Sequence, residues 1–301
     1  MEMTTHGKVQ ANGIEIVYEE TGDPDGPPLL LICGLAGQLI GWSSEFLEKL
    51  TAHGYRVILY DNRDAGLSTH LDAAGLPNMI GMLARMPGVE PAYSIEDMAD
   101  DAAGLLDALG IESAHIFGVS MGGMIAQAFV IGYPRRTRSL CSVMSRTGEP
   151  GKGMPTGEAM RVLLQPPAKK REVAIGQALE AYRTIASPGF PFDEARQLAR
   201  VTAAYDRAHD PVGTSRQLAA IMAQRDRTEA LGQVAVPTLV IHGAADALVT
   251  VDGGETTAQA IPGAELLIID GMGHDLPLEV LDQVVDAVAA NIAKAEANLS
   301  L

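Results

Sequence analysis

A glycine-flanked serine at residues 118–123, Gly-Val-Ser-Met-Gly-Gly, constrains the fold of this chain more than any other feature. The apolar run before it predicts a buried strand, and the run 124–130 after it predicts a helix. Glycines lack a β-carbon, so strand and helix can approach closely and Ser120 can adopt a strained backbone conformation. Strand, G-x-S-x-G and helix together are typical of a nucleophile elbow. The alternative is a glycine-rich turn with an unreactive serine.

Other apolar runs alternate with helical patterns on both sides of this serine. Asn12-Gly13, between two alternating segments, predicts a β-hairpin. The remaining strands are expected at 29–33, 55–60, 114–117, 140–144, 238–242 and 265–269, and helices at 43–52, 94–109, 252–260 and 278–295. This order predicts an α/β fold with a doubly wound, mostly parallel sheet and helices on both faces. Ligands of such sheets bind beyond the carboxyl ends of the strands.

One long stretch interrupts the alternation. Residues 147–231 contain helical patterns punctuated by prolines and no convincing strand. We therefore expect a helical cap, or lid, at 147–231, inserted into a core formed by 1–146 and 232–301. The irregular stretch 71–92 carries Met79, Met82 and Met86, which either pack against the core or line a substrate entrance.

Charge and composition exclude several classes of partner. The formal net charge of −16 and the lack of a basic cluster argue against nucleic acid and anionic membranes. No apolar run reaches membrane-spanning length and no apolar targeting segment is visible, so a cytoplasmic protein is expected. Cys33 and Cys141 lie in apolar runs and are expected to be buried thiols. No metal-ligand spacing occurs, and no metal or cofactor is expected. The sequence leaves open whether the chain is a monomer or a homo-oligomer.

A serine hydroxyl needs an adjacent general base, and histidine suits this task near neutral pH. Among seven histidines, His274 lies in a glycine-rich loop directly after the last strand, where its ring can reach over the elbow. His115 and His242 are interpreted as structural, because one lies within a strand and the other precedes the acid candidate. The sequence therefore favours His274 as the base.

The imidazole in turn needs a carboxylate to fix its tautomer. Asp246 follows the preceding strand and gives the chain order Ser, Asp, His. Asp270 and Asp275 lie too close to His274 in sequence to face its far nitrogen. The strand at 140–144 ends without a carboxylate, so Asp246 is the preferred acid.

A tetrahedral intermediate also requires two backbone N–H donors for its negative oxygen. Met121, directly after the serine, is one candidate. Leu35, in the glycine-containing loop after the strand at 29–33, is the other. Cys33 precedes this loop but has no base of its own, so it is interpreted as a packed thiol rather than a nucleophile.

These segments resemble the α/β-hydrolase superfamily over nearly the whole chain. The resemblance rests on residues 34–37, 60–68, 118–123, 243–249 and 271–274. Cys33-Gly34, Gly41-Trp42 and the Asp-Asn-Arg-Asp-x-Gly-x-Ser stretch at 61–68 are similar to the aclacinomycin methylesterase-like group of carboxylic ester hydrolases. The resemblance implies an eight-stranded sheet, a triad at Ser120, Asp246 and His274, and oxyanion donors at Leu35 and Met121. Leu35 replaces an expected glycine, which leaves its backbone donor in place.

Three functions remain in view at this point. The leading one is a serine hydrolase that cleaves a carboxylic ester, an apolar small-molecule substrate, through an acyl-enzyme intermediate. The second uses the same triad for C–C bond or lactone hydrolysis or for cofactor-free perhydrolysis, because fold does not fix function. The third is a non-enzymatic ligand receptor that retains the hydrolase shell. Haloalkane dehalogenases and epoxide hydrolases are disfavoured, since they carry an aspartate where this chain has Ser120.

Overall fold

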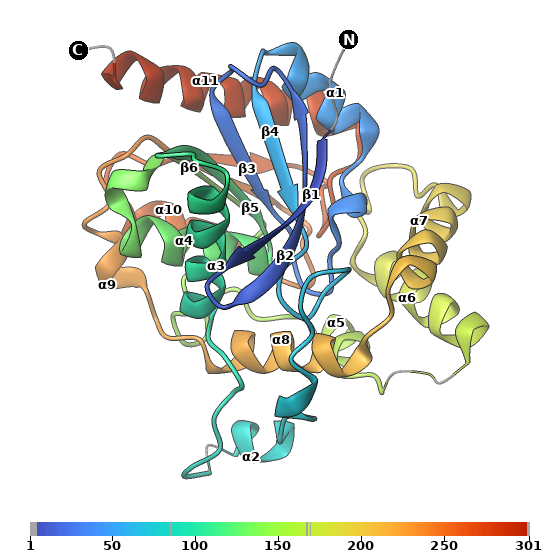
Figure 1. Ribbon diagram of the computed structural model, residues 1–301. Coiled ribbons are helices and arrows are strands. Elements are labelled where there is room, and N and C mark those ends of the chain that lie inside the picture. The colour runs from blue at the N-terminus through green and yellow to red at the C-terminus, as the bar shows by residue number, and fades with distance from the viewer. Residues whose placement is uncertain (1–4, 85, 167, 169, 300–301) are drawn as a thin grey trace.

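The computed structural model contains one eight-stranded sheet in the order β1-β2-β4-β3-β5-β6-β7-β8 (Figure 1). The structure describes residues 5–84, 86–166, 168 and 170–299. β1 and β2 form the expected hairpin, β2 pairs antiparallel with β4, and all other pairs are parallel. The prediction of a mostly parallel, eight-stranded sheet is confirmed. The strands are β1 Thr5–Ala11, β2 Ile14–Gly22, β3 Pro28–Ile32, β4 Arg56–Tyr60, β5 Ala114–Val119, β6 Thr137–Val143, β7 Thr238–Gly243 and β8 Glu265–Ile269.

Helices cover both faces of the sheet. α3 and α4 pack on one face, and α1 and α11 pack on the other. The helices are α1 Ser44–Ala52, α2 Met79–Leu83, α3 Ile95–Ala108, α4 Met121–Gly132, α5 Gly157–Leu163, α6 Arg171–Ile185, α7 Glu194–Arg207, α8 Pro211–Ala223, α9 Thr228–Leu231, α10 Asp252–Ala260 and α11 Leu281–Leu299. β6 ends one residue before its predicted end, because Met144 has a φ of 43° that a strand cannot continue.

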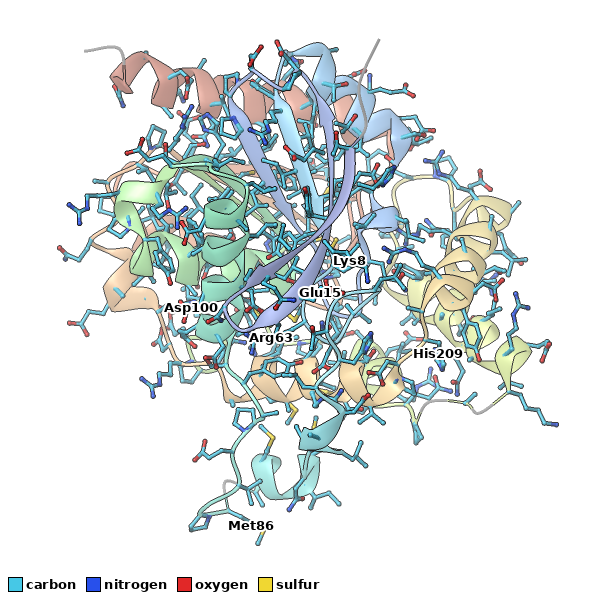
Figure 2. The ribbon with its side chains drawn as sticks, in the orientation of Figure 1. Lys8, Glu15, Arg63, Met86, Asp100 and His209 are labelled. Carbon is cyan, nitrogen blue, oxygen red and sulfur yellow. The ribbon has the colours of Figure 1, made fainter. Side chains whose placement is uncertain are left out.

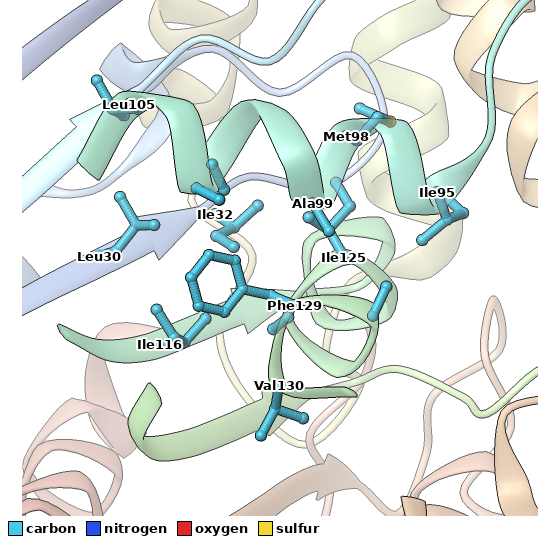
Figure 3. Close-up of a cluster of buried hydrophobic side chains, with 14 of the residues drawn as sticks. Leu30, Ile32, Ile95, Met98, Ala99, Leu105, Ile116, Ile125, Phe129 and Val130 are labelled. Atoms are coloured by element: carbon cyan, nitrogen blue, oxygen red, sulfur yellow. The ribbon is translucent and has the colours of Figure 1, made fainter. Parts of the chain in front are cut away.

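The core beside the serine-bearing helix is apolar. Figure 3 shows side chains of β3 and β5 meeting those of α3 and α4, among them Leu30, Ile32, Ile116, Ala99, Leu105, Ile125 and Phe129. Burial of such side chains stabilises the fold by about 1.5–3 kcal/mol each. The elements that carry the elbow are therefore rigidly held.

Helices α5–α9 all lie between β6 and β7, and no strand occurs among the described residues of that segment. α6 packs against α7, while α8 crosses below the carboxyl ends of the strands (Figure 1). Within the described part of the chain, no helix is both long and apolar enough to cross a membrane.

The stretch around α2 projects away from the body of the molecule. Met86 lies at its tip and is 53% exposed (Figure 2). Its packing against the core, one of the two interpretations of the methionines, is therefore wrong. Met79 and Met82 are half-buried.

Candidate active site

Ser120 occupies a strained turn between β5 and α4. Its φ of 56° and ψ of −119° lie where a residue with a β-carbon rarely occurs. Neighbouring glycines make the turn possible. A β-carbon on Gly118 would lie 2.0 Å from the Gly122 carbonyl oxygen, and one on Gly122 would lie 2.1 Å from the Ile32 carbonyl oxygen. Only glycine fits at either position, so this turn holds the serine at the carboxyl end of the sheet.

Three residues far apart in sequence form one hydrogen-bonded chain. His274 Nε2 lies 2.9 Å from Ser120 Oγ, and His274 Nδ1 lies 2.7 Å from Asp246 Oδ2. An ionised carboxylate only accepts, so Nδ1 carries the proton and Nε2 is left to accept from the serine hydroxyl. His274 is 8% exposed and Asp246 is 5% exposed, while Ser120 is half-buried. The arrangement pairs a reachable hydroxyl with a shielded base.

The Asp246 carboxylate is held ionised by its surroundings. Burial alone would raise its pKa, but the charge of His274 and hydrogen bonds from His242, His274 and Val249 N–H outweigh burial and hold the pKa well below its usual value. Its other oxygen accepts from the N–H groups of Leu248 and Val249 at 2.8 and 2.9 Å. The carboxylate can therefore stabilise a positive charge on His274 without taking up its proton.

His242 is a fully buried neighbour of that carboxylate. Its Nε2 donates to the Val249 carbonyl oxygen at 2.8 Å and lies 3.5 Å from Asp246 Oδ2. The ring thus packs under the 246–249 loop and fixes its shape. The sequence-based interpretation of His242 as structural did not foresee this contact with Asp246.

The two N–H donors expected for an oxyanion lie beside the serine. Met121 is the first residue of α4, where a helical N–H has no acceptor within the helix. Leu35 follows Gly34, which lies so close to the serine that a β-carbon added to Gly34 would be 3.2 Å from Ser120 Cβ. Among the hydrogen bonds of the described residues, none uses the N–H of Leu35 or Met121. Both donors are therefore free to bind a substrate oxygen.

The loop that carries His274 is bonded to the segment that follows α6. His274 N–H donates to the Ile185 carbonyl oxygen at 2.7 Å, and Gly273 N–H donates to Ser187 Oγ at 2.8 Å. Ser187 Oγ in turn donates to the Asp275 carboxylate. The position of the histidine therefore depends on the helical segment between β6 and β7.

A second hydrogen-bonded serine–histidine–carboxylate chain is present, but its surroundings differ from those of Ser120. Ser139 Oγ lies 2.8 Å from His115 Nδ1, and His115 Nε2 lies 3.1 Å from Glu296 Oε1. Burial lowers the pKa of His115 to about 4, and Ser139 is only 2% exposed. Ser139 and His115 lie within strands β6 and β5 and Glu296 lies on α11, so the serine is not displayed at a strand–helix turn. Its role is structural, as expected for His115.

Both cysteines are packed thiols. Burial, followed by the charge of Asp61, raises the pKa of Cys33 to about 12. Burial likewise raises the pKa of Cys141. At neutral pH neither thiol ionises, so Cys33 cannot compete with Ser120 as a nucleophile.

Arginines lie over several of the aromatic rings between β6 and β7. Arg200 lies 4.2 Å from the Tyr182 ring centre and Arg183 lies 5.6 Å from that of Phe192. Phe190 packs against the core, and Phe190 and Phe192 line a hollow of about 420 Å³ beside Ala245 and Ala247. The hollow thus borders the Asp246 loop.

Asp64, His70 and Asp210 bring ligand-type atoms within 4.8 Å of one another. Arg216 occupies this cluster, however, and donates two hydrogen bonds to Asp64 at 2.7 and 2.8 Å. His70 Nδ1 pairs with Asp210 at 2.7 Å. The negative charge is already compensated by side chains, so the cluster is a set of ion pairs.

Comparison with known proteins agrees with this architecture. Residues 27–279 match the α/β hydrolase fold family. The chain belongs to this family. It is 30% identical over 294 residues to rhodomycin D methylesterase DauP of Streptomyces sp. (strain C5). The match covers 91% of this chain and 93% of that one.

Two further α/β hydrolases illustrate the range of the relatives. A 2-hydroxy-6-oxononadienedioate/2-hydroxy-6-oxononatrienedioate hydrolase of Paraburkholderia xenovorans (strain LB400) is 29% identical over 264 residues, covering 87% of this chain and 84% of that one. The solved structure of a meta-cleavage product hydrolase from Pseudomonas fluorescens IP01 aligns with a TM-score of 0.73 at 21% identity, covering 96% of this chain and 98% of that one. The latter likeness concerns the fold alone.

Sequence reasoning overlooked several residues around the α/β-hydrolase site. Ser187, Arg216 and Gln217 all come from the segment between β6 and β7 and contact loops more than 80 residues away in sequence. None belongs to a local motif. His242 had one signal, its place four residues before Asp246.

Proposed function

We propose that this protein is a serine hydrolase that cleaves a carboxylic ester, with Ser120 as nucleophile, His274 as general base and Asp246 as its orienting acid. The observation that supports this most is the hydrogen-bonded chain from Ser120 Oγ through both nitrogens of His274 to Asp246. Its similarity to a methylesterase over 91% of the chain supports the ester as substrate.

In the first half of the proposed reaction, Ser120 Oγ attacks the ester carbonyl carbon while its proton passes to His274 Nε2. The carbonyl oxygen becomes negative and accepts hydrogen bonds from the N–H groups of Leu35 and Met121. Each such donor is typically worth about 10²–10³ in rate. Asp246 stabilises the imidazolium. The C–O bond then breaks, and the alcohol leaves with the proton from His274.

In the second half, His274 takes a proton from water, whose oxygen attacks the acyl carbon. A second oxyanion forms at the same two N–H groups. When it collapses, the bond to Ser120 Oγ breaks, the serine recovers its proton from His274, and the carboxylic acid is released. The atoms of the two halves balance with the ester, one water molecule and these residues.

We further propose that residues 147–231 act as a cap over this site, inserted into a core of residues 1–146 and 232–301. The bonds between the segment after α6 and the loop of His274 support this division of roles. The hollow beside the Asp246 loop has apolar walls at Phe190 and Phe192 and polar ones at Arg183 and Thr184, and part of a substrate can rest there.

Hydrolysis of a C–C bond with the same residues is the second candidate. It is kept because a relative named as a hydrolase of 2-hydroxy-6-oxononadienedioate, from Paraburkholderia xenovorans, is 29% identical to this chain, and the match covers 87% of it. The two candidates differ in the atom that leaves. Supplying 2-hydroxy-6-oxononadienedioate beside a panel of methyl and aryl esters separates them by which compound turns over.

The test of the main proposal is fluorophosphonate labelling together with hydrolysis of p-nitrophenyl esters. The wild type should be labelled and turn over, and S120A should lose both properties. S139A is the matched control, because it removes the other serine that is bonded to a histidine and should keep both. Hydrolysis by S120A at the wild-type rate would refute the proposal.

A further inference from the structure

α8 contributes a fully buried amide to the loop that carries Leu35. Gln217 is 0% exposed, its Oε1 accepts from Ala36 N–H at 2.8 Å, and its Nε2 donates to the Arg63 carbonyl oxygen at 2.7 Å. We propose that Gln217 is a positioning residue that holds the Leu35 N–H where it can bind the oxyanion. This inference rests on the proposed function and assigns a role in it to the cap.

The loop after β3 needs such support. Residues 33–37 belong to no helix or strand, so their backbone groups depend on other partners. Ala36 has a φ of 57°, a left-handed conformation that is unfavourable for a residue with a β-carbon. The hydrogen bond to Gln217 stabilises that conformation. The Ala36 N–H lies in the peptide plane between Leu35 and Ala36, and the Leu35 N–H lies in the preceding plane, between Gly34 and Leu35. Because the two planes meet at the Leu35 Cα, fixing the first limits the direction in which the Leu35 N–H points.

The amide can act as a support because α8 is itself fixed. Arg216, the preceding residue, forms a bidentate ion pair with Asp64 and is 1% exposed. The loop after β4 that carries Asp64 is bonded to the Leu35 loop as well, since Asn62 Nδ2 donates to the Cys33 carbonyl oxygen at 3.1 Å. Gln217 therefore bridges two loops from a helix that is locked to one of them.

A second contact shows that the cap holds the far end of the same loop. Gln38 Nε2 donates to the carbonyl oxygens of Ala204 and Ala208 at the end of α7, at 2.8 and 3.0 Å. Gln38 Oε1 accepts from Arg207 at 2.8 Å. α7 thus fixes Gln38 and α8 fixes Ala36. Of these two contacts, the one at Ala36 lies directly beside the proposed oxyanion donor.

The experiment compares Q217M with Q177M. Methionine is close to glutamine in length but forms neither bond. Gln177, on α6, is the matched control: its amide accepts from Ala168 N–H and donates to the Pro166 carbonyl oxygen, the same pattern of bonds toward a different loop. Both are purified with the wild type and compared in ester hydrolysis, inhibition by an alkyl boronic acid, thermal midpoint and pH profile.

Q217M should lower kcat about 10- to 100-fold with KM within about threefold, since a misplaced donor costs less than a deleted one. The inhibition constant of the boronic acid, which forms a tetrahedral adduct, should rise by a similar factor. The pH profile should keep its shape, because His274 and Asp246 are not touched. Q177M should match the wild type in all kinetic readouts.

Q217E tests the route of the effect. A carboxylate still accepts from Ala36 N–H but cannot donate to the Arg63 carbonyl oxygen, so Q217E should recover most of the lost kcat even if it melts earlier. If Q217M does not fold, Q217N, whose amide is one methylene shorter, takes its place.

Two results would overturn the inference. One is an unchanged kcat in folded Q217M or Q217N with only a lower thermal midpoint, which would make Gln217 purely structural. The other is a Q217E variant as slow as Q217M. Failure of the proposed function is read separately, from a wild type that is neither labelled by fluorophosphonate nor active on esters, and it would end this inference too.

Discussion

The buried ion pair between Arg216 and Asp64 should be the strongest single polar contribution to the seating of α8. Its side chains are 1% and 0% exposed, and Nη2 lies 2.7 Å from Oδ1. Coulomb's law at an effective dielectric constant of about 20 gives roughly 6 kcal/mol for unit charges at that distance. Removal of water from both groups offsets much of this attraction, but loss of one partner leaves the other charge buried. Such losses typically cost about 3–5 kcal/mol.

The perturbation is a cycle of R216M, D64N and the double variant. Asparagine suits position 64, because it tolerates the φ of 62° found there. Each single variant should lower the free energy of unfolding by about 3 kcal/mol, the lower end of the range, since Asp64 also accepts from Tyr93 OH and Leu71 N–H at 2.8 Å. The double variant should lose less than the sum by about 1–3 kcal/mol.

Equilibrium urea unfolding, followed by the fluorescence of Trp42, is a direct assay. Trp42 is the single tryptophan and stacks on Phe46 at 5.8 Å, so its emission reports on the core. R171M is the matched control, because Arg171 makes a similar bidentate pair with Asp206 that is 43% and 51% exposed, and its midpoint should barely move. Single variants that lose less than about 1 kcal/mol, or effects that simply add, would refute the reasoning.

Three other changes have defined outcomes. S187A, which removes the acceptor of Gly273 N–H, should lower kcat about tenfold in ester hydrolysis; an unchanged rate would show that the Ser187 bond does not position the proposed base. The folded-state pKa of Asp246 lies below the unfolded value of about 3.9, so its carboxylate stabilises the fold above that pH and loses this contribution as the pH falls. D246N should therefore have a lower thermal midpoint than the wild type at pH 7. The difference between the two midpoints should shrink below about pH 4, and a difference that does not change with pH would contradict this. Raised thiol pKa values predict that Cys33 and Cys141 react with Ellman's reagent only after urea is added, and rapid reaction in buffer would contradict their burial.

The sheet and the positions of the main site candidates could be read from the sequence because their signals are local. Apolar runs mark strands, and the carboxyl ends of parallel strands meet at one edge. Ser120, Asp246 and His274 each directly follow such a strand, so chain order alone indicates that they approach one another. Leu35 and Met121 were predicted as oxyanion donors in the same way, because one lies in the loop after a strand and the other directly follows the serine.

The supporting residues could not be found this way. Gln217 lies 181 residues from Ala36, and an isolated glutamine on an amphipathic helix gives no sign of which loop it will meet. The same is true of Ser187 and Gly273. Core packing of Met86 was one of two interpretations, and it failed because a methionine on a projecting loop cannot be told from a core methionine by residue type alone.

The contact between Gly189 and Gly271 bears on how this protein can be re-engineered. Gly189 N–H donates to the Gly271 carbonyl oxygen at 2.9 Å, and a β-carbon on either residue would lie within 2.8 Å of the other's Cα. Two backbone segments of the chain therefore touch here without side chains between them. When the proposed cap is exchanged between related proteins, this contact is where the inserted segment meets the host. A bulkier residue at position 189 of the inserted segment would displace the loop of His274. Chimaeras that retain residues 185–190 of the host should keep the hydrogen bonds from His274 to Ser120 and Asp246. Libraries that vary the proposed substrate preference are best confined to the helices on either side.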